Sequence, residues 1–254
     1  MATNQLSVFK SVVSAPDIQR KIKASMGDAS GAFIASLLDL YESDTTLQKC
    51  DPQKVALECV KAAALKLPLV KSLGFAYVVP YKNVPTFTIG YKGLIQLAQR
   101  SGQYRCINAD VVYEGELLGF NKLSGMPDLT GERTGDNVVG YFSYFQLLNG
   151  FEKTIYMTRE DMDAWGKRYS PSYTSSYSPW KTEFDKMALK TCLRRLISTY
   201  GVMSTEMQTA LMADVNVQQS VNNEVQANAA TIPVDTNTGE VLDAEAVQYE
   251  EELE

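Results

Sequence analysis

The sequence contains no histidine in its 254 residues. Histidine is the usual general base of hydrolytic triads and a common zinc ligand. Its absence therefore excludes Ser-His-Asp triads, Cys-His pairs, HNH-type nucleases and His-ligated zinc. The cysteines are also sparse, at Cys50, Cys59, Cys106 and Cys192, and none has the Cys-x-x-Cys spacing of a zinc site. We expect them to be reduced thiols.

Long apolar runs are missing as well. No stretch approaches the roughly 20 apolar residues that a membrane-spanning helix needs. The first residues, MATNQLSVFKS, lack the apolar centre of a signal peptide. A hydrophobic content of 45% is ordinary for a globular protein. These features predict a cytoplasmic protein with either one large domain or two small ones.

Basic residues are absent from the last part of the chain. No lysine or arginine follows Arg195, so residues 206–254 carry 11 acids and a net charge of −11. Residues 1–205 carry 24 bases and 19 acids, a net charge of +5. A basic body followed by an acidic tail is typical of proteins that contact nucleic acid and use the tail for interactions.

Acidic residues are absent between Glu58 and Asp110. This window of 51 residues has a net charge of +7, from Lys61, Lys66, Lys71, Lys82, Lys92, Arg100 and Arg105. The same window contains Tyr77, Tyr81, Phe87, Tyr91 and Tyr104. Cations that follow phosphates and flat side chains that support bases are what a single-stranded nucleic-acid surface needs. An ordinary hairpin and helix with a solvated basic face would give the same composition.

The middle of this window predicts a β-hairpin followed by a helix. Two runs of alternating side chains flank a polar turn at Lys82-Asn83, with Phe75, Tyr77, Val79 and Tyr81 on one side of the first run and Phe87, Ile89 and Tyr91 on one face of the second. Pro80 and Pro85 lie near the turn, which places at least one strand at an edge. After Gly90 the spacing becomes that of an amphipathic helix ending near Gly102.

The flanking segments complete an α+β fold. Before the hairpin we predict helices that begin at Pro16, at an Asp28 cap and at an Asp51-Pro52 cap. Residues 1–15 are predicted to be a flexible lead-in, with a short amphipathic helix over Leu6 to Val13 as the alternative. After it we predict an antiparallel sheet of three strands, with a loop over 119–137, an Asn149-Gly150 turn and a helix capped by Thr158. The strands are expected over residues 104–116, 138–148 and 151–157.

Two later segments are also basic. Residues 166–180 carry Lys167 and Arg168 and then a tyrosine at every fourth position, which indicates a solvated connector or a clamp that orders on a nucleic-acid strand. Residues 180–200 predict one long helix. At 100° per residue, Lys186, Lys190 and Arg194 form a stripe within about 80° beside its apolar seam. A solvated basic face remains the alternative for this stripe.

Hydrophobic residues become rare after Ala213. The chain is therefore predicted to consist of the lead-in, a nucleic-acid-binding domain over residues 16–212, and a mostly disordered acidic interaction tail over residues 213–254.

Several segments, taken together and in this order, resemble the RecT family of phage single-strand annealing recombinases. They are GFAYVVPYKN, GYKGLIQLAQRSGQY, NGFEKTIYMTRE and DKMALKTCLRRL, and the likeness runs over roughly residues 15–210. The resemblance implies an α+β fold and an ATP-independent protein that binds one DNA strand and pairs it with its complement. It implies no catalytic residue and no cofactor, with Mg²⁺ only as a counterion. It also implies rings or helical filaments of this chain, a phage exonuclease partner and contact with the host single-strand-binding protein.

The resemblance also implies which residues contact DNA. Its matching positions imply that Lys82, Tyr91, Lys92, Arg100, Lys181, Lys186, Lys190 and Arg194 line the DNA. The basic segments add Arg105, Lys167 and Arg168 as candidates. Gly90 and Gly93 flank Tyr91 and Lys92, and glycines at a helix start allow a phosphate backbone to approach closely.

Two other functions are weighed against annealing. Asp110, Glu114 and Glu116 share one side of a predicted strand, with Asp128, Glu132 and Asp136 in the loop that follows, and carboxylate clusters can hold Mg²⁺ in nucleases. The Glu-x-Lys pattern of strand-borne nuclease sites is missing, however. The nearer alternative is a protein that protects single-stranded DNA without annealing it.

Overall fold

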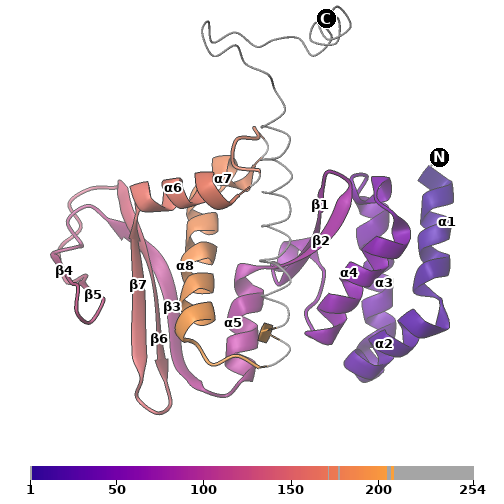
Figure 1. The fold of residues 1–254 in the computed structure, drawn as a ribbon, viewed down its shortest axis with the longest axis horizontal. Helices are drawn as coiled ribbons and strands as arrows, with labels where there is room; N and C mark the ends of the chain where they lie inside the picture. Colours follow the sequence, from indigo (N-terminus) through magenta and orange to yellow (C-terminus); the bar gives the residue numbers. More distant parts are fainter. Residues whose placement is uncertain (1, 171, 177, 205–206, 209–254) are drawn as a thin grey trace, which may run out of the picture.

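The computed structural model describes residues 2–170, 172–176, 178–204 and 207–208. It confirms the α+β class: helices gather at one end of the long axis, an antiparallel sheet at the other, and α5 (Tyr91–Arg100) and α8 (Phe184–Tyr200) lie between them (Figure 1). The tail predicted for residues 213–254 lies outside the described residues.

The N-terminal helices are α1 (Ala2–Val13), α2 (Pro16–Met26), α3 (Ser30–Ser43) and α4 (Pro52–Ala64). The predicted cap of α4 is confirmed, because the Asp51 carboxylate accepts a hydrogen bond of 2.8 Å from the Gln53 N–H. The predicted Asp28 cap is wrong. Asp28 lies within the short 3₁₀ turn η1 (Gly27–Ala29), and α3 begins after Ala29 without a side-chain cap.

Helix α1 is part of the core, which differs from the flexible lead-in predicted for residues 1–15, and it contains the alternative helix considered over Leu6 to Val13. Phe9 is fully buried and stacks on Tyr41 of α3, with 4.1 Å between the ring centroids. Val13 is buried one helical turn further on. The spacing of these side chains gives α1 an apolar stripe, and packing of that stripe stabilises a helix that would be marginal in isolation.

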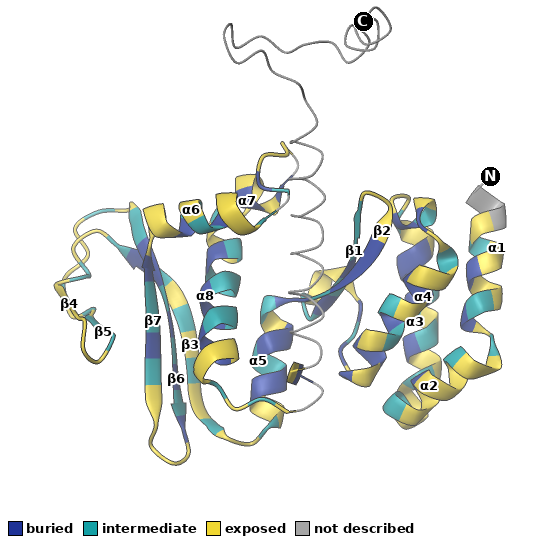
Figure 2. Cartoon of the chain, in the orientation of Figure 1, coloured by how far each residue is buried: buried dark blue, intermediate teal, exposed yellow. Residues whose placement is uncertain are grey.

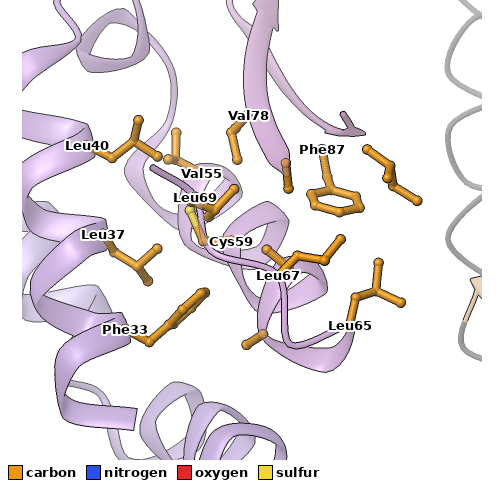
Figure 3. Close-up of a cluster of buried hydrophobic side chains, with 14 of the residues drawn as sticks. Phe33, Leu37, Leu40, Val55, Cys59, Leu65, Leu67, Leu69, Val78 and Phe87 are labelled. Carbon is orange, nitrogen blue, oxygen red and sulfur yellow. The ribbon is translucent and has the colours of Figure 1, made fainter. Parts of the chain in front are cut away.

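The larger hydrophobic core joins these helices to the hairpin. Apolar side chains from α3, α4, the segment that follows α4, and both hairpin strands meet there (Figure 3). The labelled members are Phe33, Leu37, Leu40, Val55, Cys59, Leu65, Leu67, Leu69, Val78 and Phe87. Burial of this apolar area holds the hairpin against α4.

The predicted hairpin is confirmed. Strands β1 (Ala76–Tyr81) and β2 (Val84–Ile89) pair antiparallel, and Lys82 and Asn83 in the turn have φ angles of 47° and 63°. Two positive φ angles are what the tight turn of a right-twisted hairpin requires. The sheet has two strands, so both are edges. The outward Phe87 N–H donates to the Glu58 carboxylate at 2.8 Å, which satisfies part of the β2 edge.

The glycines at the start of α5 are required by the chain's own backbone. A Cβ at Gly90 would lie 2.1 Å from the Gly74 carbonyl oxygen, and one at Gly93 would lie 2.0 Å from the Phe75 carbonyl oxygen. The space that was expected to admit a phosphate backbone is therefore filled by residues 74 and 75. These contacts fix α5 against the segment that enters β1.

The second half of the molecule is built on the predicted three-stranded sheet. Its strands β3 (Tyr104–Tyr113), β6 (Val138–Leu147) and β7 (Glu152–Thr158) are antiparallel, in the order β3-β6-β7. Gly150, with φ of 87°, lies in the predicted turn between β6 and β7. Helix α6 (Arg159–Tyr169) then begins at the predicted cap, where the Thr158 hydroxyl accepts a 3.0 Å hydrogen bond from the Asp161 N–H.

Two predictions for this half are wrong. The predicted loop over 119–137 contains a small hairpin of β4 (Gly119–Asn121) and β5 (Met126–Asp128), which lies beyond the edge strand β7. The single helix predicted over 180–200 is divided into α7 (Pro179–Thr182) and α8. The interruption is at Glu183, with φ −142° and ψ 49°, because the Ser178-Pro179 cap starts a short helix of its own.

We predict that Gly93→Ala destabilises the fold. The new methyl group overlaps the Phe75 carbonyl, so the free energy of unfolding should fall by about 2 kcal/mol or more. Gly31→Ala is the matched control, since nothing lies within 4 Å of its Cβ position in α3. That change should be neutral or stabilising by up to about 1 kcal/mol. Urea unfolding of both variants measures the difference, and equal stabilities would contradict this account of the α5 start.

Candidate nucleic-acid interface

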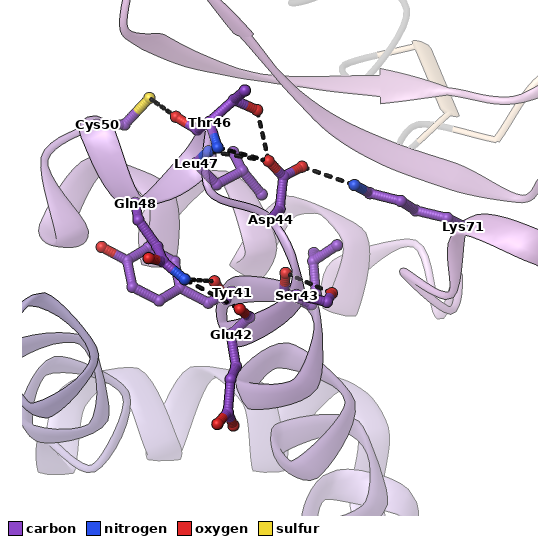
Figure 4. Close-up of polar contacts among 10 residues, drawn as sticks. Tyr41, Glu42, Ser43, Asp44, Thr46, Leu47, Gln48, Cys50 and Lys71 are labelled. Atoms are coloured by element: carbon purple, nitrogen blue, oxygen red, sulfur yellow. Dashed lines mark hydrogen bonds and ion pairs between the residues drawn. The ribbon is translucent and has the colours of Figure 1, made fainter. Parts of the chain in front are cut away.

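The seven cations of the acid-free window are not equally available to a ligand. The Lys61 ammonium pairs with Glu58 at 2.6 Å, and the Lys71 ammonium pairs with Asp44 at 2.6 Å. Glu58 lies three positions before Lys61 on the same helix, whereas Asp44 lies 27 positions before Lys71 and only the tertiary fold brings that pair together (Figure 4). The local positive charge is therefore smaller than the sequence window indicates.

Arg100 has a structural role. Its guanidinium donates to the carbonyl oxygens of Leu65 at 2.7 Å and Lys66 at 3.0 Å, just beyond the last residue of α4. The carbonyl groups at a helix C-terminus lack partners within the helix and carry partial negative charge, so a cation stabilises them. Arg100 thus holds the end of α5 against the end of α4, although its side chain remains exposed.

The other cations of the window are exposed and form no ion pair with any residue in the described ranges. They are Lys66, Lys82, Lys92 and Arg105. Lys82 occupies the tip of the β1–β2 hairpin, Lys92 the first turn of α5 and Arg105 the start of β3. Lys66, which is not among the predicted site residues, follows α4 with φ of 52°. These four side chains can neutralise phosphates without first breaking an ion pair.

Tyr91 is only partly available for stacking. Its ring is half-buried against the N-terminal core, and burial, followed by the nearby Asp110 carboxylate, raises the pKa of its phenol. The phenol therefore stays neutral at physiological pH. The Asp110 charge is close enough to influence this position, so the interface is not uniformly positive.

Helix α8 brings a second set of cations beside α5. Its Leu193 and Ile197 are buried in the same cluster as Leu94 and Leu97 of α5, so the two helices lie side by side (Figure 1). Lys190 and Arg194 flank this contact and are half-buried. At the start of α8, the Lys186 ammonium pairs with Glu183 at 2.7 Å. Lys181 lies in α7 and is exposed.

Much of the segment 166–180, predicted to be a solvated connector or a clamp, instead belongs to helices and to a hydrophobic core cluster. Lys167 and Arg168 lie in the last turn of α6 rather than in a loop, and Lys167 pairs with Asp163 at 2.5 Å. Tyr173 is buried against Trp180, with 5.8 Å between the ring centroids, and its hydroxyl donates to Asp163. Tyr173 is therefore a core residue. Tyr177 of the same predicted series lies outside the described residues.

A polar network that sequence reasoning missed fixes the start of α8. The Tyr141 hydroxyl donates to the Asp185 carboxylate at 2.6 Å, and Arg159 donates to the Tyr141 oxygen at 2.8 Å. Burial, together with the hydrogen bond to Asp185, raises the pKa of Tyr141. The network ties α8 to β6 and to the start of α6. Its members lie up to 44 positions apart, so no local sequence pattern could have identified it.

The carboxylates considered for a nuclease site do not gather. Asp110 lies on β3, the Glu116 carboxylate accepts a hydrogen bond of 2.7 Å from the Tyr113 N–H, and Glu114 accepts one from Asn137. In the part of the chain that the structure describes, no three Asp, Glu, Cys or His side chains are placed to hold a metal ion. Nor does any described helix combine the length and apolarity needed to cross a bilayer.

The candidate interface therefore comprises exposed cations on the hairpin, α5 and the start of β3, together with the half-buried cations of α8. Figure 2 shows that the hairpin and α5 are mostly buried or intermediate, and their exposed residues are Lys82, Asn83 and Val84 at the turn and Lys92, Gln99 and Arg100 on α5. Such a surface can attract a phosphate backbone of any sequence, because cations contact phosphates rather than base edges. The model of the RecT family matches residues 31–228 of this chain.

The chain belongs to the RecT family. It is 38% identical to the uncharacterised protein YqaK of Bacillus subtilis strain 168 over 229 residues, which cover 90% of this chain and 79% of YqaK. It is 33% identical to Protein RecT of Escherichia coli K12 over 181 residues, which cover 66% of this chain and 65% of that protein. Membership in the RecT family supports single-stranded DNA binding and a role in recombination by single-strand annealing.

We predict that Lys92→Ala weakens single-stranded DNA binding equally across sequences. One lost phosphate contact should reduce the salt slope of the binding constant by roughly one unit. Lys61→Ala is the matched control, because its charge is already paired with Glu58, and it should change the slope less. Fluorescence anisotropy over a salt titration measures both slopes. Identical slopes for wild type and Lys92→Ala, with both proteins folded, would remove α5 from the interface.

Proposed function

We propose that this protein binds one DNA strand along the hairpin, α5 and α8 and anneals it to its complement without ATP, in phage recombination. The observation that carries the proposal is that Lys82 at the hairpin tip and Lys92 on α5 are exposed and form no ion pair with a described residue, while α5 packs against α8, in a chain of the RecT family. The DNA-contacting side chains proposed are those of the predicted set other than Arg100, whose guanidinium holds carbonyl groups of the chain.

Annealing places modest chemical demands on a protein. No covalent bond forms or breaks, so neither a nucleophile nor a general base is needed, and we propose that this protein is not an enzyme. Two strands repel each other through their phosphates, and cations on one side of a strand reduce this repulsion while leaving the base edges free. A nucleotide or metal cofactor has no step to perform in this scheme, and Mg²⁺ would act as a counterion only.

The proposed partners follow from the same scheme. An annealing protein must cover many nucleotides, so copies of this chain are proposed to assemble as a ring or a helical filament on DNA. A phage exonuclease would supply the single strand, and the host single-strand-binding protein would hold it before annealing. We propose that the acidic residues 213–254 serve as a docking segment for such partners in the bacterial cytoplasm.

We predict that the purified protein accelerates pairing of two complementary oligonucleotides without any nucleotide. Because no chemical step uses ATP, adding ATP should leave the rate unchanged. The measurement is the fluorescence transfer between labels on the two strands over time. Single-strand binding without faster pairing would favour the alternative, a protein that only protects single-stranded DNA.

We predict that truncation after Ala213 retains DNA binding and annealing in vitro. The removed segment carries ten acids and no base, so at low salt its loss should leave affinity unchanged or slightly tighter. In cells, recombination should fall because partner recruitment is lost. A truncated protein that binds DNA but no longer anneals in vitro would show that the tail takes part in annealing itself.

A further inference from the structure

Helix α4 is closed by a lysine in a left-handed backbone conformation. Lys66 has a φ of 52°. Its N–H donates to the Ala63 carbonyl at 2.9 Å, and the N–H of Leu67 donates to the Ala62 carbonyl at 3.0 Å. These two bonds form the Schellman motif, which ends a helix through one left-handed residue. Glycine is the usual residue at that position, because it lacks the Cβ that makes the conformation costly.

The stability of the fold does not explain a lysine at this position. Leu65 and Leu67 on either side are buried in the larger hydrophobic core (Figure 3), whereas Lys66 is exposed and forms no ion pair with a described residue. A cation can stabilise the carbonyl groups at a helix C-terminus. Arg100 already does so, because its guanidinium donates to the carbonyl oxygens of Leu65 and Lys66. Stability alone would therefore favour glycine at position 66.

A second lysine has the same unfavourable backbone. In the described ranges, the residues other than glycine with a positive φ are Lys66, Lys82 and Asn83. Asparagine tolerates this conformation, but lysine does not favour it, and tight hairpin turns prefer Asn, Asp or Gly where Lys82 lies. Both lysines belong to the acid-free window, and both are exposed. Costly backbone conformations that persist in a fold indicate a functional role. Lys82 is already in the proposed DNA-contacting set, whereas Lys66 is not.

The contacts of Arg100 place Lys66 at the C-terminal end of α5. The Lys66 carbonyl oxygen lies 3.0 Å from the Arg100 guanidinium. The exposed residues of α5, Lys92, Gln99 and Arg100, fall within about 100° of one another around the helix axis. From Lys92 to Arg100 the helix rises by about 12 Å. A strand that follows this exposed side from Lys92 reaches the end at Lys66 after roughly three to four nucleotides, at about 3.4 Å for each.

We propose that Lys66 contacts a phosphate of the bound single strand at the C-terminal end of α5, and that Arg100 is the positioning residue that holds it there. This inference rests on the proposed function and adds one contact to its DNA-binding site. A lysine bound to a phosphate carries no sequence information, so the contact serves strands of any sequence. The left-handed backbone lowers stability, and in return it presents a cation at the end of α5.

The first test is Lys66→Gly, which removes the cation and relieves the backbone in one change. The melting temperature should rise by about 2–4 °C, since the left-handed conformation no longer carries a Cβ. The salt slope of single-strand binding, measured by fluorescence anisotropy, should fall by about 0.7 unit through the loss of one phosphate contact. Lys66→Arg retains the charge and should bind as wild type. Lys23→Ala, which removes an exposed lysine from the last turn of α2, is the control for overall charge and should leave the slope unchanged.

Two results of this test would overturn the contact. The first is a wild-type salt slope for Lys66→Gly while Lys92→Ala lowers the slope, which would leave the proposed function in place. The second is a lower melting temperature for Lys66→Gly, which would show that the lysine stabilises the end of α4. A wild-type protein that binds no single strand would instead contradict the proposed function itself, and this inference with it.

The second test examines Arg100 as a positioning residue. Arg100→Lys keeps the positive charge but loses the planar fork that spans two carbonyl groups. It should weaken single-strand binding about twofold or more when residue 66 is lysine and have no effect in the Lys66→Gly protein. Thermal unfolding followed by circular dichroism confirms that each variant is folded. Equal weakening in both proteins would mean that Arg100 contacts the strand directly, and no weakening in either would also overturn the positioning role.

Discussion

Helix α8 packs against both the N-terminal helical half and the sheet, and the arrangement of the candidate interface depends on this packing. Leu193 and Ile197 are buried with α5 and the N-terminal helices, whereas Cys192 and Leu196 are buried against the sheet. One helix therefore contributes to three hydrophobic clusters, one on the side of the N-terminal helices and two on the side of the sheet. Because burial on two sides leaves only a narrow polar strip, Lys190 and Arg194 lie at the boundary between the halves and are half-buried. This geometry aligns the cations of α8 with those of α5.

The start of α5 is fixed by a second contact, in which the backbone of residues 74 and 75 packs directly against Gly90 and Gly93. Gly90 and Gly93 allow residues 74 and 75 to pass directly over the first turn of the helix. As a result, Lys92 is presented from a rigid position rather than from a loop. The Arg159–Tyr141–Asp185 network has the same effect at the start of α8, where it ties the helix to β6 and α6. Both helices of the proposed interface are thus fixed at their N-terminal ends.

Electrostatics in the folded chain differ from the charge pattern along the sequence. Lys61 and Lys71 are neutralised by Glu58 and Asp44, and Arg100 is engaged by carbonyl groups of the chain. Surface ion pairs contribute little stability, but a phosphate must replace the carboxylate before it can use the lysine. The cations without such partners in the described residues, with Lys82 and Lys92 among them, are therefore the ones we expect to dominate DNA affinity.

The sequence by itself determined the local features of this protein. The Lys82-Asn83 turn, the Asp51 and Thr158 caps and the antiparallel strands depend on neighbouring residues, so periodicity and capping patterns predicted them. The motif resemblance predicted the family for the same reason, since its segments are contiguous. The break at Glu183 and the β4–β5 hairpin were missed, because each depends on a weak local preference that short-range patterns do not resolve.

Tertiary structure alone decided which charged and aromatic side chains are available. The partners of Lys71, Arg100 and Tyr141 are 27, 35 and 44 positions away, and such distances leave no trace in a local pattern. The burial of Phe9 and Tyr173 depends likewise on surfaces supplied by other elements. A side chain's type is fixed by its own position in the sequence, whereas its exposure and its ion pairs depend on which distant segments fold against it.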